Sequence, residues 1–307
     1  MELHRIIVTG ASGPLGVVLI KECIRRGIEV AALVRPGSKK RDDIPKDELV
    51  HVYEVDLGKI ADFSFEDNKP YDVLIHFGWM YTEGSGRYDA LRQSENVTAT
   101  LKTAEFAKRC GCNVFVGAGS QAEYGPQNKK LDETAETKPV VAYGIAKTAA
   151  YNLLKEYGRM NDMRINWIRI FSVYGPYEND YVFTSYVIRT LLEGKEPELT
   201  ACEQKWDYLY CEDVVRAFLL VAEKAQGSGI YNLGAGQTCS LKEFVECIKD
   251  TIDPSLSLGI GKRPYSENQI MHLEADISKI CKDTGFEPEI SIQEGIKKTV
   301  EWYKSTI

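Results

Sequence analysis

The pair of residues with the clearest chemical meaning is Tyr143 and Lys147, which stand four positions apart. On a helix this spacing places a phenol and an ammonium on the same face. A neighbouring cation favours the phenolate and lowers the pKa of a tyrosine from its ordinary value of about 10 toward neutrality. Such a tyrosine can exchange a proton with a substrate oxygen. The same spacing also fits two residues on a solvated helix surface.

A serine hydroxyl is expected beside this pair. The strand predicted over 113–117 leads into a glycine-rich segment that contains Ser120. The carboxyl end of a parallel strand faces the ligand crevice of such a sheet. The Ser120 hydroxyl could therefore donate a hydrogen bond to a carbonyl oxygen while Tyr143 transfers the proton. The alternative is an ordinary turn serine.

A glycine-rich turn near the start of the chain predicts a nucleotide site. A strand over Arg5–Thr9 runs into a GxxGxxG turn and then into a helix. Glycines allow backbone amides to approach a pyrophosphate, and the helix N-terminus adds partial positive charge. An ordinary βα turn is the alternative. The residues expected at the cofactor here are Gly10, Ser12, Gly13, Pro14, Leu15 and Gly16.

The end of the second predicted strand indicates which dinucleotide binds. An acidic residue there would bind the ribose 2′-hydroxyl of NAD. The chain has Arg35 instead, followed by Lys39, Lys40 and Arg41. Because a guanidinium matches a phosphate dianion, the sequence predicts NADP, with NAD the less favoured cofactor.

Further cofactor contacts are expected at the ends of other strands. Asp56 and Leu57 follow the third strand, where a carboxylate could reach the adenine amino group or could simply cap the strand. We also expect Phe77, Gly78 and Phe171 to contact the cofactor.

The elements that must position these residues alternate between strands and helices. Near-continuous aliphatic runs predict strands that are buried on both faces. This alternation predicts an α/β fold with a doubly wound parallel sheet. We expect a dinucleotide-binding domain over 1–171, to which 206–229 return, and a smaller C-terminal α/β substrate lobe over 172–205 and 230–307. The predicted strands are Arg5–Thr9, Glu29–Val34, Val50–Val55, Asp72–Phe77, Asn113–Gly117 and Arg164–Ile170, and the helices between them are Pro14–Arg26, Tyr88–Arg109 and Tyr143–Met160.

Composition excludes several classes of function. The 307 residues are 44% apolar and 27% charged, as in ordinary globular proteins. A net charge of −7 argues against nucleic-acid binding. No apolar run approaches the ~18 residues of a membrane span, and no signal peptide is recognisable, so a cytoplasmic protein is expected. Eight scattered cysteines and four histidines show no metal-ligand spacing, which predicts reduced thiols and no metal site.

Together these segments resemble the extended short-chain dehydrogenase/reductases, the NAD(P)-dependent epimerase/dehydratase family. The resemblance spans nearly the whole chain. It implies a Rossmann sheet with a substrate lobe, nucleotide-sugar substrates, and Ser120, Tyr143 and Lys147 as the catalytic set, with Lys147 also holding the nicotinamide ribose. Besides the glycine turn and the catalytic residues, the segments that carry it are Asp72–Phe77, Asn96–Val97, Ser120 with Tyr124, Arg169–Pro176, Asp207–Val214, Tyr231–Gly234, Arg263–Pro264 and Val300–Tyr303.

The chain departs from the dehydratases of this family just after Ser120. Those enzymes carry an Asp-Glu pair that protonates a leaving hydroxyl and abstracts a proton. Here the two positions are Gln121 and Ala122, and Glu123 comes one position late, so that its side chain is expected to point elsewhere. Because Ala122 has no acid–base capacity, sugar dehydration is disfavoured.

Substrate contacts are also expected to differ from the family pattern. Ser172 replaces the usual asparagine, and Trp206 replaces an arginine. By resemblance, Arg263 clamps the diphosphate of the sugar nucleotide, although a surface salt bridge is its alternative. Trp206 could stack on a base or ring, or could only pack between the lobes. Gln121, Ser172, Trp206 and Arg263 are therefore the expected substrate-binding residues.

The leading functional prediction is an NADPH-dependent reductase of a nucleotide-linked keto sugar of the 4-keto-6-deoxy type. Alternatives are a nucleotide-sugar epimerase that acts through transient oxidation, a reductase of a small hydrophobic carbonyl, and an NADP-binding regulatory protein without turnover. Family analogy further suggests a homodimer through the helices Tyr88–Arg109 and Tyr143–Met160. Apolar residues of the second helix could equally belong to the core.

Overall fold

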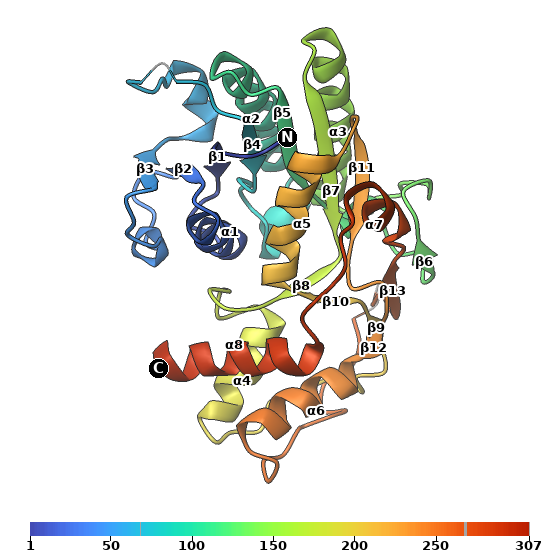
Figure 1. Cartoon of the computed structure of the whole chain (residues 1–307). Coiled ribbons are helices and arrows are strands. Elements are labelled where there is room, and N and C mark those ends of the chain that lie inside the picture. Colours follow the sequence, from blue (N-terminus) through green and yellow to red (C-terminus); the bar gives the residue numbers. More distant parts are fainter. Residues whose placement is uncertain (68, 267–268, 307) are drawn as a thin grey trace.

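The computed structural model describes residues 1–67, 69–266 and 269–306. Its centre is a seven-stranded parallel sheet with the strand order β11-β7-β5-β4-β1-β2-β3 (Figure 1). Most strand residues are buried, because helices cover both faces of the sheet. The strands are β1 (Arg5–Thr9), β2 (Glu29–Val34), β3 (Val50–Glu54), β4 (Val73–His76), β5 (Val114–Ser120), β7 (Arg164–Ile170) and β11 (Gly229–Leu233).

Two pairs of helices sandwich this sheet. Helices α1 (Pro14–Arg25) and α5 (Cys211–Lys224) pack together on one face, and α2 (Ala90–Arg109) and α3 (Ala142–Met160) pack together on the other. The strand order reverses between β1 and β4, which is where doubly wound sheets bind ligands outside the carboxyl ends of their strands. The predicted α/β architecture is thereby confirmed.

A smaller lobe lies at the carboxyl edge of the sheet (Figure 1). Its helices α4 (Phe183–Leu192), α6 (Leu241–Ile252) and α8 (Ile292–Thr306) pack against one another. The parallel strands β8 (Ser172–Tyr174) and β10 (Tyr208–Tyr210) pair beside them. A four-stranded sheet completes the lobe and contains β6 (Lys130–Leu131), β9 (Lys205–Trp206), β12 (Cys239–Ser240) and β13 (His272–Ala275).

The linear division of the chain into domains needs two corrections. Strand β11 pairs with β7 along its whole length, so residues 230–233 belong to the large sheet and not to the lobe. Strand β6 pairs with β13, so residues 130–131 of the first segment join the lobe's sheet. In both cases pairing between distant segments overrides their order in the chain. The short helix α7 (Ser278–Thr284) packs on α5 and β11. The rest of the division remains a prediction.

The thiols and helices add two findings. All eight cysteines are free thiols. Among the described residues, no helix has the length and apolar character needed to cross a membrane.

Candidate active site

Helix α3 carries Tyr143 and Lys147 on its first turns, at the carboxyl edge of the sheet. The helix start packs tightly against the short 3-10 helix η4 (Gln121–Glu123). A Cβ on Gly144 would lie 2.3 Å from the carbonyl oxygen of Ala122, which a larger residue could not accept without moving the backbone. Gly144 therefore allows the close approach that brings Tyr143 to the end of β5.

Lys147 is buried, with 4% of its surface exposed. Its Nζ donates a hydrogen bond to the carbonyl oxygen of Ala118 at 2.6 Å and lies 3.7 Å from the ring centre of Trp79. Burial lowers the pKa of Lys147 well below its ordinary value, and Glu123 only partly opposes this shift. The ammonium is thus fixed by a carbonyl and an aromatic face and not by a carboxylate.

The pKa of Tyr143 is shifted in the opposite direction from the sequence prediction. Burial raises its pKa above the ordinary value of about 10, while Arg87 and hydrogen bonding with Ser120 pull it down. The expected net lowering by Lys147 is therefore wrong for this structure. The reason is desolvation, which the spacing of two residues in the sequence does not reveal.

Ser120 ends β5 and begins η4 through a capping box. Its hydroxyl accepts a hydrogen bond from the backbone N–H of Ala122 at 3.2 Å, and its own N–H donates to Oε1 of Glu123 at 2.9 Å. This arrangement fixes the serine beside Tyr143. Glu123 also accepts from Trp167 and pairs with Arg169 at 2.8 Å, so it points into the protein, as expected.

The opening turn has the shape of a nucleotide cradle. Gly10 has a φ of +67°, and a Cβ there would lie 2.8 Å from the backbone nitrogen of Gly78. Helix α1 begins with Gly13 as its N-cap, without a side-chain cap and without an acidic residue in its first turn. Its first N–H groups and its dipole are therefore available to an anion. The residues fit a dinucleotide diphosphate.

Two adjoining cavities of about 800 and 350 Å³ extend along this edge of the sheet. Both sizes lie in the range typical of small-molecule sites. The larger cavity is lined by Gly10, Ser12, Arg35, Asp56, Leu57 and Gly78, among others. The smaller is lined by Gly10, Gly13, Pro14, Leu15, Gly16, Phe77, Ser120, Tyr143, Lys147 and Phe171, among others. The structure thus brings the expected catalytic and cofactor residues to one continuous edge.

Arg35 and Asp56 line the larger cavity beside the ends of β2 and β3. Arg35 is exposed and forms no ion pair with the described residues. Asp56 lines the larger cavity, but its Oδ1 accepts a hydrogen bond from the N–H of Gly58 at 2.9 Å. Asp56 is therefore a cap of the following 3-10 turn as well as a cavity residue, so both alternatives for it are compatible with its position.

The expected substrate residues do not gather at these cavities. Gln121, Ser172, Trp206 and Arg263 are absent from both linings. Trp206 donates its Nε1–H to the carbonyl oxygen of Ile270 at 2.9 Å and packs at the lobe boundary. Arg263 is exposed and pairs with Glu198 at 3.3 Å. Of the two alternatives given for Arg263, the structure contains the surface salt bridge.

Three residues in or beside the smaller cavity were not predicted from the sequence. Trp79 lines the cavity and supports Lys147. Arg87 stacks on Tyr143 with its Cζ 4.2 Å from the ring centre. Glu178 lines the cavity, and its Oε2 is buried without a hydrogen-bond partner among the described residues. All three lie in the connections that follow strands. There the sequence shows the position of a residue along the chain but not the direction in which its side chain points.

Burial raises the pKa of Glu178 to about 8, and the positive charge of Lys40 only partly opposes this. This shift favours the protonated carboxyl, which can donate a hydrogen bond to a ligand in the cavity.

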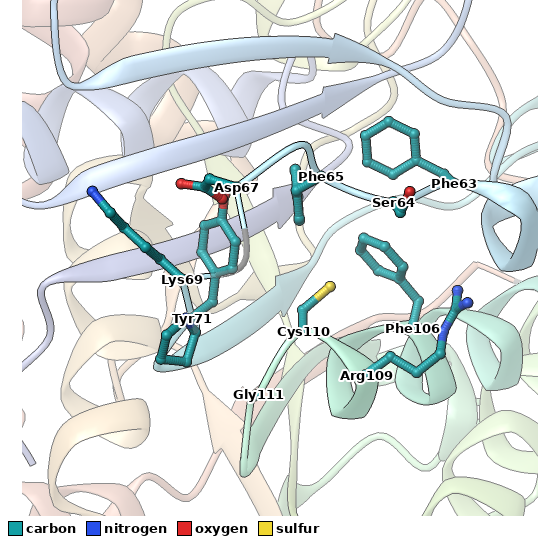
Figure 2. Close-up of a pocket in the computed structure, with 11 residues that line it drawn as sticks. Phe63, Ser64, Phe65, Asp67, Lys69, Tyr71, Phe106, Arg109, Cys110 and Gly111 are labelled. Atoms are coloured by element: carbon teal, nitrogen blue, oxygen red, sulfur yellow. The ribbon is translucent and has the colours of Figure 1, made fainter.

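Another cavity, of about 290 Å³, lies at the far end of α2 (Figure 2). Aromatic side chains of Phe63, Phe106 and Tyr71 surround it beside Cys110. Because Tyr71 precedes β4 and Cys110 follows α2, this cavity lies at the amino edge of the sheet, away from Tyr143. It shares no lining residue with the two cavities at the carboxyl edge.

Comparisons with known proteins agree with this geometry. A UDP-glucuronate 4-epimerase of Thermodesulfobacterium geofontis is 30% identical over 218 residues, which cover 69% of this chain and 66% of that protein. The structure of a UDP-N-acetylglucosamine 4-epimerase from Methanobrevibacter ruminantium M1, in complex with UDP-N-acetylmuramic acid, shares the fold. Its TM-score is 0.89 at 23% identity, with 100% of both chains covered.

MoeE5, solved in complex with UDP-glucuronic acid and NAD, superposes with a TM-score of 0.83 at 25% identity and covers 99% of this chain and 100% of that one. The model of the NAD dependent epimerase/dehydratase family matches residues 6–234, which is most of the chain. The chain therefore belongs to the NAD dependent epimerase/dehydratase family.

Proposed function

We propose that this protein is a nucleotide-sugar epimerase that oxidises a sugar hydroxyl transiently and reduces the resulting ketone on its other face. The observation that carries this proposal is the meeting of Ser120, Tyr143 and Lys147 in one cavity with the glycine turn of α1. The epimerases among the similar proteins support it.

The residues of the cavity divide the work as follows. A bound nicotinamide supplies the acceptor and donor of the hydride. The Tyr143 side chain, as its phenolate, takes the proton of the substrate hydroxyl during oxidation, and the hydroxyl so formed returns it during reduction. The Ser120 hydroxyl donates a hydrogen bond to the same substrate oxygen and stabilises the charge that develops there. The Lys147 Nζ lies 5.7 Å from the ring centre of Tyr143, and the ring of Trp79 supports it there.

Retention of the ligands is a requirement that separates epimerisation from simple reduction. An epimerase must keep its dinucleotide and its ketone intermediate through both half-reactions. Two loops meet near the cavities, because Nδ2 of Asn179 donates a hydrogen bond to Oε1 of Glu83 at 3.2 Å. Both residues line the larger cavity, and Asn179 lines the smaller one as well. This contact joins the two loops beside the cavities, and we propose that it helps to retain the ligands through both half-reactions.

The second candidate is an NADPH-dependent reductase of a nucleotide-linked keto sugar. The observation that favours it is Arg35, which lines the larger cavity and whose guanidinium could bind a 2′-phosphate. A reductase must exchange its spent cofactor in every cycle, which NADP(H) in solution allows. Arg35 thus supports NADP as the cofactor, whereas relatives such as MoeE5 were solved with NAD.

The two candidates differ in their use of cofactor. The purified protein would be denatured and the released nucleotide identified, and the native protein would be incubated with UDP-, dTDP-, GDP- and CDP-linked sugars and keto sugars. An epimerase interconverts two stereoisomers without net change in NAD(P)H. A reductase consumes one NADPH for each keto sugar. Absence of both reactions across the panel would contradict the proposed function.

We also propose that the protein is a homodimer through α2 and α3. Large apolar side chains are exposed on or beside these helices, including Leu91 at 81%, Ile145 at 54%, Leu153 at 49% and Met160 at 72%. A second copy would cover them. Light scattering should give twice the chain mass for the native protein, and a single-chain mass for Leu153→Glu. A monomeric native protein would contradict this proposal.

A further inference from the structure

A guanidinium lies against the ring of the reactive tyrosine. Arg87 belongs to the 3-10 helix η3 (Gly84–Tyr88), in the loop between β4 and α2. Its Cζ is 4.2 Å from the ring centre of Tyr143, and its Nη1 donates a hydrogen bond to the carbonyl oxygen of Thr82 at 3.1 Å. The loop therefore holds a cation on the aromatic face of a residue that belongs to a different element.

The ammonium of Lys147 is placed less directly. Its Nζ lies 5.7 Å from the ring centre of Tyr143, compared with 3.7 Å from that of Trp79, and it donates to the carbonyl oxygen of Ala118. Burial also favours the neutral form of this amine by lowering its pKa. A guanidinium, in contrast, stays charged at every pH at which the protein is folded.

We propose that Arg87 is a positioning residue for Tyr143, which orients its ring and makes its hydroxyl a stronger acid. This inference rests on the proposed function, since it assumes that Tyr143 transfers the proton. A cation within about 4–6 Å stabilises the phenolate relative to the phenol, and a stacked guanidinium also restricts the ring.

The charged and polar groups around Tyr143 come from four elements. Arg87 faces it from η3, Ser120 from the end of β5, Glu123 from η4 and Lys147 from α3 itself. Burial raises the pKa of Tyr143 and Glu123 adds to this, while Arg87 opposes it most strongly and Ser120 follows. Arg87 is thus the group whose removal should affect the phenol most.

The test is a direct titration of the Tyr143 hydroxyl. Protein labelled with [13Cζ]tyrosine would be titrated by NMR, and the signal of Tyr143 identified by its loss in Tyr143→Phe. Arg87→Gln should raise the titration midpoint by about one pH unit or more. Arg87→Lys, which keeps the charge, should bring the midpoint back toward the native value. An unchanged midpoint in Arg87→Gln would overturn the proposal.

Controls separate this effect from altered folding and from loss of net charge. Arg109→Gln removes the same charge at the far end of α2, where the guanidinium faces Phe106, and should leave the midpoint unchanged. If Arg87→Gln does not fold, Arg87→Met keeps an unbranched side chain over the ring and should give the same upward shift. A shift of equal size in Arg109→Gln would also overturn the proposal.

A kinetic measurement connects the titration with turnover. Once a substrate is known, Arg87→Gln should shift the limb of the pH–rate profile that Tyr143 sets. This is the acidic limb when Tyr143 acts as a base and the basic limb when it acts as an acid. The shift should equal that of the NMR midpoint. The titration itself needs no substrate, so it can succeed even if the proposed function fails.

Discussion

Two buried cations lie close together in this protein, and they differ in their partners. Arg169 is 3% exposed and pairs with the fully buried carboxylate of Glu123 at 2.8 Å. Lys147 is 4% exposed, and among the described residues it has no carboxylate within ion-pair distance. The first cluster is closed, whereas the second opens into the cavity that Tyr143 and Ser120 also line.

This difference appears in the pKa values. Burial opposes the charge of Arg169, but Glu123 and Tyr124 outweigh it and raise the pKa of the guanidinium. Burial lowers the pKa of Lys147, and the more distant Glu123 does not compensate. A buried charge with a close counter-ion is compatible with a stable fold, whereas a buried charge without one lowers the stability. Such an incompletely paired charge is typical of a site where a ligand can interact with it.

The largest expected effect is on catalysis and comes from the open cluster of Lys147, Tyr143 and Ser120. Tyr143→Phe removes the proton-transferring hydroxyl and should lower kcat by about 10²–10⁴-fold while nucleotide binding persists. Steady-state kinetics and fluorescence titration with NADPH measure the two properties. Tyr151→Phe, on the same helix but against Trp167, is the matched control and should keep its activity. Full activity of Tyr143→Phe would instead favour a non-catalytic nucleotide-binding protein.

A substitution in the closed cluster of Glu123 and Arg169 should lower the stability of the fold. Glu123→Ala leaves Arg169 buried without its counter-ion and should cost about 3–5 kcal/mol in the free energy of unfolding. Urea denaturation followed by circular dichroism measures this loss. Glu156→Ala breaks an exposed pair with Arg159 on α3 and should cause no measurable change. Equal losses of unfolding free energy in Glu123→Ala and Glu156→Ala would show that the buried ion pair stabilises the fold no more than the exposed one.

Replacing the incompletely paired cation should have the opposite sign. Lys147→Met substitutes an apolar side chain for a buried amine and should raise the free energy of unfolding by about 1–4 kcal/mol while abolishing turnover. Because the folded-state pKa is lowered, the native amine costs most at low pH and least above its ordinary pKa. The gain should therefore be larger at pH 6 than at pH 9.

Denaturation of Lys147→Met at both pH values tests this, with the exposed Lys155→Met as control. A variant that loses stability at pH 6 would show that Lys147 supports the fold.

The smallest effect is expected at Glu178. Its folded-state pKa of about 8 lies above the ordinary value of 4.5, so the native protein binds more protons than the unfolded chain between these values. Stability from this group is complete below pH 4.5 and is lost as pH rises through 8. Glu178→Gln should therefore gain about 1–2 kcal/mol over the native protein above pH 8, after allowance for partial solvent exposure.

Urea denaturation across this pH range measures the difference, with the exposed Glu105→Gln as reference. Parallel curves for the native protein and Glu178→Gln would mean that the carboxyl is already ionised at neutral pH.

The sequence was sufficient for the elements and for the residues that follow strands closely. The glycine turn, Ser120, and the pair of Tyr143 and Lys147 could be predicted because their backbone positions follow from strand–helix alternation. Arg87 could not, because the loop before α2 folds back over α3 through contacts that no local pattern encodes. The direction of the Tyr143 pKa shift was also missed, since burial depends on the packing of the whole site.

Domain assignment failed where distant segments pair. Strand β11 joins β7, and β6 joins β13, although each lies on the other side of the expected boundary. Substrate contacts could not be predicted either. Arg263 and Trp206 follow family positions, but the structure places their side chains against Glu198 and Ile270. Residue identity alone does not determine which partner a side chain meets.

The most direct test is a crystal structure of the protein with NADPH or NAD(H) bound. The account predicts the diphosphate on the turn from Gly10 to Gly16 and the nicotinamide ring in contact with Tyr143 and Lys147, while the pair of Glu123 and Arg169 stays unchanged. A dinucleotide bound elsewhere, or a Tyr143 hydroxyl directed away from the nicotinamide, would contradict it.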